Sequence, residues 1–218
     1  MAWAEFTAAF VVFFLSHSIP VRPRVRAALV AQLGARGFTI AYSALSLTVL
    51  AWLIGATARA PYVPLWFWAP WQNIVVLIVM AAVCLLLASA IGRPNPFSFG
   101  GAQNDPFDPD NPGIVRITRH PLLVALALWA FAHVLPNGDL AHVILFAVFG
   151  GFAIIGQRII DRRKQRQMGD AWAQVWAQTR QAPKTRAAIT PARAIAAVAL
   201  YLGLIWLHPL AFGVSPLS

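Results

Sequence analysis

The chain has 218 residues, of which 59% are apolar and only 11% are charged, whereas about 25% of the residues in an ordinary soluble domain are charged. This balance excludes a disordered chain and argues against a soluble globular domain. The formal charge of +10 does not indicate nucleic-acid binding, because basic residues confined to a few loops of an apolar chain are typical of membrane topology. A single cysteine, Cys84, excludes an internal disulfide framework and is expected to be a small buried hydrophobic residue.

Six apolar segments approach the roughly 20 residues that a membrane-spanning helix requires. In chain order they cover residues 3–19, 38–58, 71–91, 122–135, 140–160 and 194–212. The fourth is short, so it must either borrow residues 117–121 to cross or lie tilted behind its neighbours. Glu5 and the absence of Lys or Arg before the first apolar run favour a retained helix over a signal peptide. The sequence therefore predicts an all-α, polytopic membrane bundle of about six transmembrane helices, forming one domain over residues 1–218.

The distribution of basic residues predicts the orientation in the membrane. Sixteen of the 17 Lys and Arg residues fall on the connections after the first, third and fifth segments, and only Arg59 follows the second. Cytoplasmic loops carry the basic excess, so both termini are expected to face the periplasm. The rings of Trp66, Trp68 and Trp71 are expected to anchor the outer ends of the second and third segments in the headgroup layer.

Residues 161–182 are polar and basic, and Met168, Trp172, Val175 and Trp176 recur there at helical spacing. This pattern predicts an amphipathic helix on the cytoplasmic surface. Its basic face could attract anionic lipid. Alternatively, the helix is a connector that packs Trp172 and Trp176 on the bundle.

The long connection over residues 92–118 is rich in proline and contains Asp105, Asp108 and Asp110. These acids could offer oxygen ligands to a hard cation, although the proline spacing does not resemble a calcium loop. They could equally set turns at a membrane surface, and long loops are often functional.

The five histidines are the side chains in the apolar part that best support metal or acid-base chemistry. His17 ends the first segment and His120 begins the fourth, both near the predicted cytoplasmic boundary, whereas His133 lies towards the outer face. Polar groups within a span usually face the bundle interior, which favours His17 and His133 as site residues. His142 and His208 are expected to be satisfied residues near helix ends. The sequence suggests neither a pair of carboxylates nor a Ser-His-Asp set.

Several short motifs together resemble a known family. They are His17-Ser18, Arg119-His120-Pro121, Trp129-x-x-x-His133 and Asn137-Gly138-Asp139. The pattern resembles the NnrU family of bacterial membrane proteins, which is associated with nitrite and nitric oxide metabolism in denitrifying bacteria. That family is also similar to plant 15-cis-zeta-carotene isomerase, a membrane enzyme that uses haem b to isomerise a polyene double bond.

The resemblance implies a bacterial inner-membrane protein with a buried haem b whose metal ligands are His17 and His133. It also implies His120 as a further cofactor-binding candidate, and Arg119 and His120 as catalytic candidates. The expected partners are the lipid bilayer, a hydrophobic polyene substrate and respiratory nitrogen-oxide enzymes, with no nucleic acid. The isomerase has an alternative cysteine ligand three residues before its second histidine. Here that position is Ala130, so a redox-linked change of ligand from His to Cys is not expected.

Two alternatives belong to other functional classes. The Arg119-His120-Pro121 motif with the later residues 168–176 is also similar to membrane methyltransferases that act on isoprenylcysteine or lipids. In that interpretation the basic motif and residues 161–183 would enclose S-adenosylmethionine, although the paired glutamates usual in those enzymes are replaced here by Asp161 and basic residues. The other alternative is a non-catalytic membrane partner that supports assembly or regulation.

Overall fold

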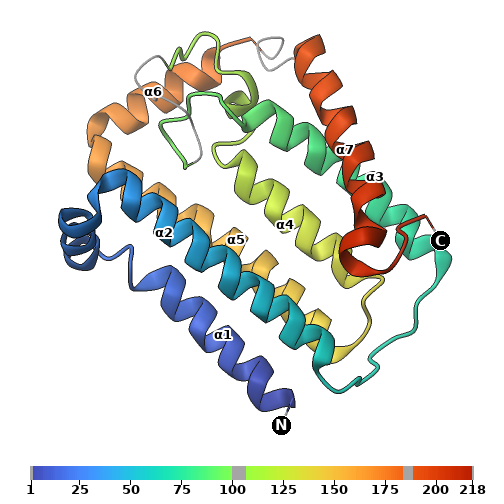
Figure 1. Cartoon of the computed structure of the whole chain (residues 1–218). Coiled ribbons are helices and arrows are strands. Elements are labelled where there is room, and N and C mark those ends of the chain that lie inside the picture. Colours follow the sequence, from blue (N-terminus) through green and yellow to red (C-terminus); the bar gives the residue numbers. More distant parts are fainter. Residues whose placement is uncertain (1, 100–106, 184–188, 218) are drawn as a thin grey trace. The chain divides into compact units, whose positions relative to one another are not determined.

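The computed structural model is all-helical, and it describes residues 2–99, 107–183 and 189–217. The described helices, in chain order, are α1 (Ala2–Ser18), α2 (Pro23–Arg59), α3 (Pro70–Ala90), the 3-10 helix η1 (Gly113–Arg116), α4 (Pro121–Val134), α5 (Leu140–Met168), α6 (Asp170–Gln181) and α7 (Pro191–Phe212) (Figure 1). The chain divides into two compact units. Unit 1 contains Met1–Leu65 and Asp139–Leu145, and unit 2 contains Trp66–Gly138 and Phe146–Ser218.

Unit 1 is built on the pair α1 and α2, which run antiparallel. The start of α1 meets the end of α2, because the Glu5 carboxylate accepts hydrogen bonds from Trp52 Nε1 (3.3 Å) and from Arg59 Nη2 (2.5 Å). Phe6 and Leu53 are buried in this pair. Arg59, the one basic residue on the predicted outer side, therefore has a carboxylate partner.

Helix α2 is interrupted at Gly34, whose φ of 69° and ψ of 164° are not helical. A residue with a side chain rarely adopts this positive φ, so glycine permits the break. The apolar segment predicted over residues 38–58 lies wholly in the part after the break.

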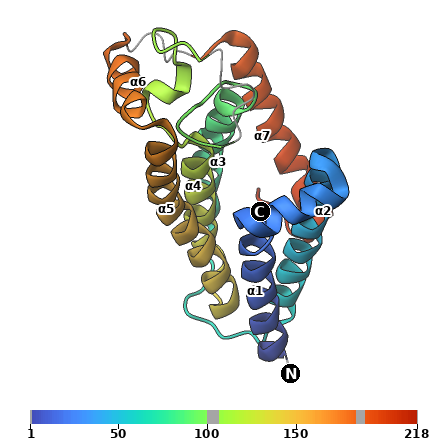
Figure 2. The same ribbon diagram turned by 90° about the vertical axis from the view of Figure 1, so that its left-hand side faces the viewer.

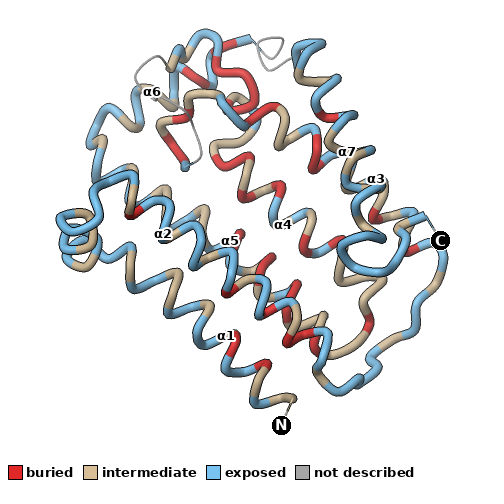
Figure 3. The backbone as a smooth tube through the Cα atoms, in the orientation of Figure 1, coloured by how far each residue is buried: buried red, intermediate tan, exposed pale blue. Residues whose placement is uncertain are grey.

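In unit 2, α3 contacts both α4 and α7. The α3–α7 pair is antiparallel, because Tyr201 Oη donates to the carbonyl of Leu77 (3.2 Å) while Arg193, at the other end of α7, donates to the carbonyl of Ala88. Cys84 on α3 is 1% exposed, which confirms the expectation that it is a buried hydrophobic residue. Along α7 the large apolar side chains are exposed, as expected for a helix whose surroundings are lipid (Figure 3); they include Ile195, Val198, Leu202, Trp206 and Leu210.

The six predicted apolar segments coincide with α1, α2, α3, α4, α5 and α7. Four of them (α2, α3, α5 and α7) are long and apolar enough to cross a membrane. Helix α4 begins only at Pro121, because His120 before it has φ −123° and ψ 57°. Its 14 residues span about 21 Å, less than the roughly 30 Å hydrocarbon layer. Of the two options for this segment, lengthening it through residues 117–121 is therefore wrong.

The predicted surface helix over residues 161–182 is not one helix. Residues 161–168 continue α5, and Gly169 with φ 57° ends it. Helix α6 then starts at Asp170 and turns away from the end of α5, as Figures 1 and 2 show. The spacing correctly placed Trp172, Val175 and Trp176 on one helix face, but it could not detect the break, because a glycine alone does not reveal its φ.

Candidate functional site

The predicted site residues fall in three places. His17 is in the last turn of α1 in unit 1, His133 is in the last turn of α4 in unit 2, and Arg119 and His120 directly precede α4. His17 and His133 thus belong to different units. In unit 2 the structure brings Arg119 and His120 together with residues that the sequence interpretation did not select.

Four side chains of unit 2 form a hydrogen-bonded group that we call the His120 cluster: Ser98, Arg119, His120 and Asp161. His120 Nε2 lies 3.0 Å from Asp161 Oδ1, and His120 Nδ1 lies 3.0 Å from Ser98 Oγ. Arg119 donates twice to the same carboxylate, from Nε to Oδ1 (3.0 Å) and from Nη2 to Oδ2 (2.7 Å). The side chain of His120 is 3% exposed and that of Asp161 is 18% exposed, so the cluster is largely excluded from solvent.

The proton positions in the cluster follow from its partners. An ionised carboxylate only accepts, so His120 Nε2 carries a proton, and Nδ1 of the neutral ring accepts from the Ser98 hydroxyl. Burial lowers the pKa of His120 below its ordinary value, and the hydrogen bond that His120 donates to Asp161 opposes that effect only in part. His120 is therefore neutral with both ring nitrogens engaged, and its nitrogens are not free for a metal in this arrangement.

Aromatic side chains cover the cluster on the α6 side. The Arg119 guanidinium lies over the rings of Trp172 (5.4 Å to the centroid) and Trp176 (4.7 Å). Both tryptophans also meet Phe97 edge-on, at 6.0 and 5.4 Å between centroids. Of the two interpretations of this amphipathic segment, the structure shows the one in which Trp172 and Trp176 pack on the rest of the unit.

The loop before the cluster is held by Asn95. Its Nδ2 donates to the carbonyl of Arg119 (2.9 Å), and its Oδ1 accepts from the backbone N–H of Phe97 (3.1 Å). One side chain therefore fixes both the cluster arginine and the residue before Ser98. At the other side, Arg116 Nε donates to the carbonyl of Ala182 (2.9 Å) and ties η1 to the end of α6.

The expectation that no Ser-His-Asp set exists is wrong, because Ser98, His120 and Asp161 meet although they are far apart in sequence. The geometry supports positioning more than nucleophilic attack. Ser98 is 3% exposed, and the carboxylate of Asp161 is shared with Arg119 rather than reserved for the histidine. One signal could have pointed to Asp161: it is the single acid in a run of basic residues at the end of an apolar segment.

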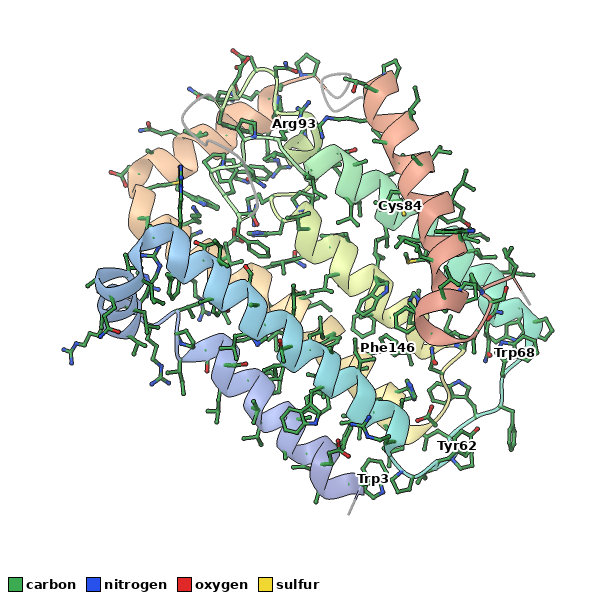
Figure 4. All side chains as sticks on the ribbon, viewed as in Figure 1. Trp3, Tyr62, Trp68, Cys84, Arg93 and Phe146 are labelled. Atoms are coloured by element: carbon green, nitrogen blue, oxygen red, sulfur yellow. The ribbon has the colours of Figure 1, made fainter. Side chains whose placement is uncertain are left out.

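His133 has a different environment. Its Nδ1 lies 2.8 Å from the carbonyl of Trp129, four residues earlier, so Nδ1 carries the proton and donates. The rings of Trp129 and Phe146 lie 5.4 and 5.5 Å from the imidazole (Figure 4 labels Phe146). Within the part of the chain that the structure describes, Nε2 makes no hydrogen bond. A histidine that ligates a metal through Nε2 donates its Nδ1 proton in the same way.

His17 repeats this arrangement in unit 1. Its Nδ1 lies 2.8 Å from the carbonyl of Phe13, again four residues earlier, and 3.2 Å from Ser16 Oγ. The Phe13 ring lies 4.1 Å from the imidazole, centroid to centroid, and the Tyr42 ring lies 6.2 Å away. His17 Nε2 likewise makes no hydrogen bond to the described residues.

The remaining histidines are both hydrogen-bonded at a helix end. His142 Nδ1 lies 2.7 Å from Asp139 Oδ2. The other carboxylate oxygen of Asp139, Oδ1, accepts from the backbone N–H of His142. His208 Nδ1 lies 2.8 Å from the carbonyl of Val214. His208 also shares unit 2 with His133. This makes His208 an informative control for any role of His133.

Of the acidic loop, Asp108 and Asp110 are described, whereas Asp105 lies outside the described residues. Asp108 Oδ1 accepts from the backbone N–H of Asp110 (2.9 Å), so this carboxylate stabilises a turn. Among the described residues, no group of three or more His, Cys, Asp or Glu side chains is arranged to hold a metal ion.

The helical architecture and its long apolar helices define a multi-pass membrane protein. The chain belongs to the NnrU family: the sequence model described as "NnrU protein" matches residues 5–216 and so covers both units. No curated protein and no solved structure matches the chain significantly.

Proposed function

We propose that this NnrU-family chain binds haem b in the membrane, and that His133 and His17 are the residues that would ligate its iron. The observation that carries the proposal is the hydrogen bonding of the two rings. Each donates its Nδ1 proton to the carbonyl four residues earlier, and its Nε2 makes no hydrogen bond to the residues that the structure describes. A backbone carbonyl on the non-ligating nitrogen fixes the ring orientation and raises the basicity of the other nitrogen.

The surroundings of these rings also fit a haem. Both lie on apolar helices among aromatic side chains, and an apolar shell of this kind excludes water and tunes an iron potential. A bound haem b would supply a redox-active iron. Residues of this chain would hold and shield it, while the carbonyls of Phe13 and Trp129 keep each ring in the ligating orientation.

The activity that this proposal supports is cis-trans isomerisation of a polyene or a role in nitrite and nitric oxide metabolism. The isomerisation would use a haem in an apolar environment, and both functions are expected of a protein in the bacterial inner membrane. Within that function Arg119 and His120 act as positioning residues, because their polar atoms hold Asp161, Ser98 and α6 in place. The same arrangement does not favour the methyltransferase alternative, since Asp161, the acid that would meet a sulfonium, already binds Arg119 and His120.

The first experiment is an oxidised and dithionite-reduced visible spectrum of the protein purified in detergent, with haem quantified as the pyridine haemochrome. We expect a near-stoichiometric b-type signal that is lost in His17→Ala and in His133→Ala. His142→Ala and His208→Ala are the matched controls and should keep their haem. A folded wild-type protein without haem would overturn the proposal.

The same variants separate the ligand assignment from haem binding itself. If His208→Ala loses haem and His17→Ala keeps it, the pair lies within unit 2 and the assignment of His17 is wrong. With haem present, turnover of a cis-polyene would support the isomerase, whereas a nitric oxide-dependent spectral change without such turnover would support the nitrogen-oxide role.

A further inference from the structure

A pair of arginines in unit 2 lies outside the sites described so far. Arg93 directly follows Gly92, whose φ of 70° turns the chain away from α3. The backbone N–H of Arg93 donates to the carbonyl of Ala90, the last residue of α3. Arg193 is in the first turn of α7. Figure 4 shows Arg93 at the same end of unit 2 as the start of α7. Arg193 Nη1 reaches the carbonyl of Ile91, two residues before Arg93, so the two arginines belong to the end of α3 and the start of α7, which are apolar helices of 21 and 22 residues.

The Arg193 guanidinium is fixed at the end of α3. Its Nη1 donates to the carbonyls of Ala88 (2.5 Å) and Ile91 (3.2 Å), which have no partner further along the helix. This side chain thus caps α3 through one nitrogen, and its other donors make no hydrogen bond to the part of the chain that the structure describes.

The Arg93 guanidinium lies directly against the backbone of Gly113. A Cβ atom at Gly113 would be 1.6 Å from Arg93 Nη1, so the glycine leaves the space that the guanidinium occupies. In the described residues Arg93 makes no hydrogen bond or ion pair with any side chain. The carboxylates that form ion pairs there are those of Glu5, Asp139 and Asp161, and none of them pairs with Arg93. Burial and then the charge of Arg193 lower the pKa of Arg93. Among the described residues these two half-buried like charges have no carboxylate partner, and such an arrangement is unfavourable unless an anion binds.

We propose that Arg93 and Arg193 form a phosphate-binding site, and that the phosphate it binds belongs to an anionic membrane lipid. Guanidinium groups match phosphate oxygens in charge and in planar, bidentate geometry. The ends of the two apolar helices place the pair at the level of the headgroups. Exposed apolar side chains flank the site, namely Ile91, Ile189 and Ile195, and they offer a surface for the acyl chains of a lipid that a free phosphate would not use.

This site is independent of the haem proposal and can be tested without haem. The full-length protein is reconstituted in nanodiscs of phosphatidylcholine with increasing phosphatidylglycerol, and retained phosphatidylglycerol is counted by native mass spectrometry at fixed salt. Arg93→Gln is the test variant, because the Arg93 side chain forms no hydrogen bond with the described residues and the backbone N–H that donates to Ala90 is unchanged. Arg180→Gln, on the exposed face of α6, is the matched control with the same change in charge.

We expect Arg93→Gln to weaken phosphatidylglycerol retention about tenfold, as for the loss of one charge-assisted phosphate contact, and Arg180→Gln to change it less than about twofold. Inorganic phosphate at millimolar concentration should not displace the lipid. Equal retention in the two variants would overturn the site, and displacement by inorganic phosphate would overturn the assignment to a lipid. If Arg93→Gln does not fold, Arg93→Lys decides the question: retention several-fold below wild type supports the site, and wild-type retention overturns it.

Discussion

Replacing Asp161 by Asn tests whether the His120 cluster stabilises unit 2. In the wild type two carboxylate oxygens accept three N–H groups, two from Arg119 and one from His120. An asparagine of the same shape has one acceptor oxygen and one NH₂ donor. With its oxygen at the position of Oδ1, its NH₂ would face Arg119 Nη2 at 2.7 Å, donor against donor.

The expected cost follows from burial. Removing one partner of a buried charge pair costs about 3–5 kcal/mol. Because 27% of the Arg119 side chain and 18% of the Asp161 side chain are exposed, we expect the lower end, about 3 kcal/mol. At roughly 2–4 °C per kcal/mol for a chain of this size, Tm should fall by roughly 6–12 °C.

The assay uses the single cysteine. Cys84 is 1% exposed on α3 of unit 2, so a thiol-reactive fluorogenic dye reports the opening of this unit as temperature rises. Asp170→Asn is the matched control, since Asp170 is exposed in the first turn of α6; its Tm should change by about 2 °C or less. A Tm for Asp161→Asn that equals that of Asp170→Asn would refute a stabilising role for the cluster.

Three further predictions follow from other parts of the molecule. Gly138→Ala should lower the free energy of unfolding by about 1–3 kcal/mol, because its Cβ would lie 2.3 Å from the carbonyl oxygen of Trp66. Gly151→Ala has open space around its Cβ and should leave the stability unchanged, and denaturant or thermal melts of both variants check this. Since the pKa of His120 is lower in the folded than in the unfolded chain, the unfolded chain gains the proton first on acidification. Stability should therefore be complete above about pH 6.5 and should fall as the pH drops towards the folded pKa, and a wild-type slope of Tm against pH in His120→Gln would contradict this. Reporter fusions after residue 182 should be cytoplasmic and fusions at both termini periplasmic, and the opposite pattern would show that the basic residues do not set the orientation.

Much of the fold could be predicted because a membrane imposes a local rule. Each spanning helix must satisfy its own backbone and expose apolar side chains to lipid, so hydropathy along the chain identified the apolar helices. The spacing of Trp172 and Trp176 likewise predicted their shared face, since helical periodicity is a property of a short segment. The family was also recognisable from short motifs, and the family match confirms it.

What only the tertiary structure decided is which distant residues meet. Ser98, His120 and Asp161 come from a loop, a helix start and the end of another helix, and no periodicity links their positions. The φ of Gly169, which breaks the predicted surface helix, is also set by the surroundings of that residue. The same holds for the start of α4 at Pro121, which leaves that helix short. Hydropathy ranks a residue by its affinity for lipid or water, but the partner that satisfies a buried polar atom is fixed by packing in three dimensions.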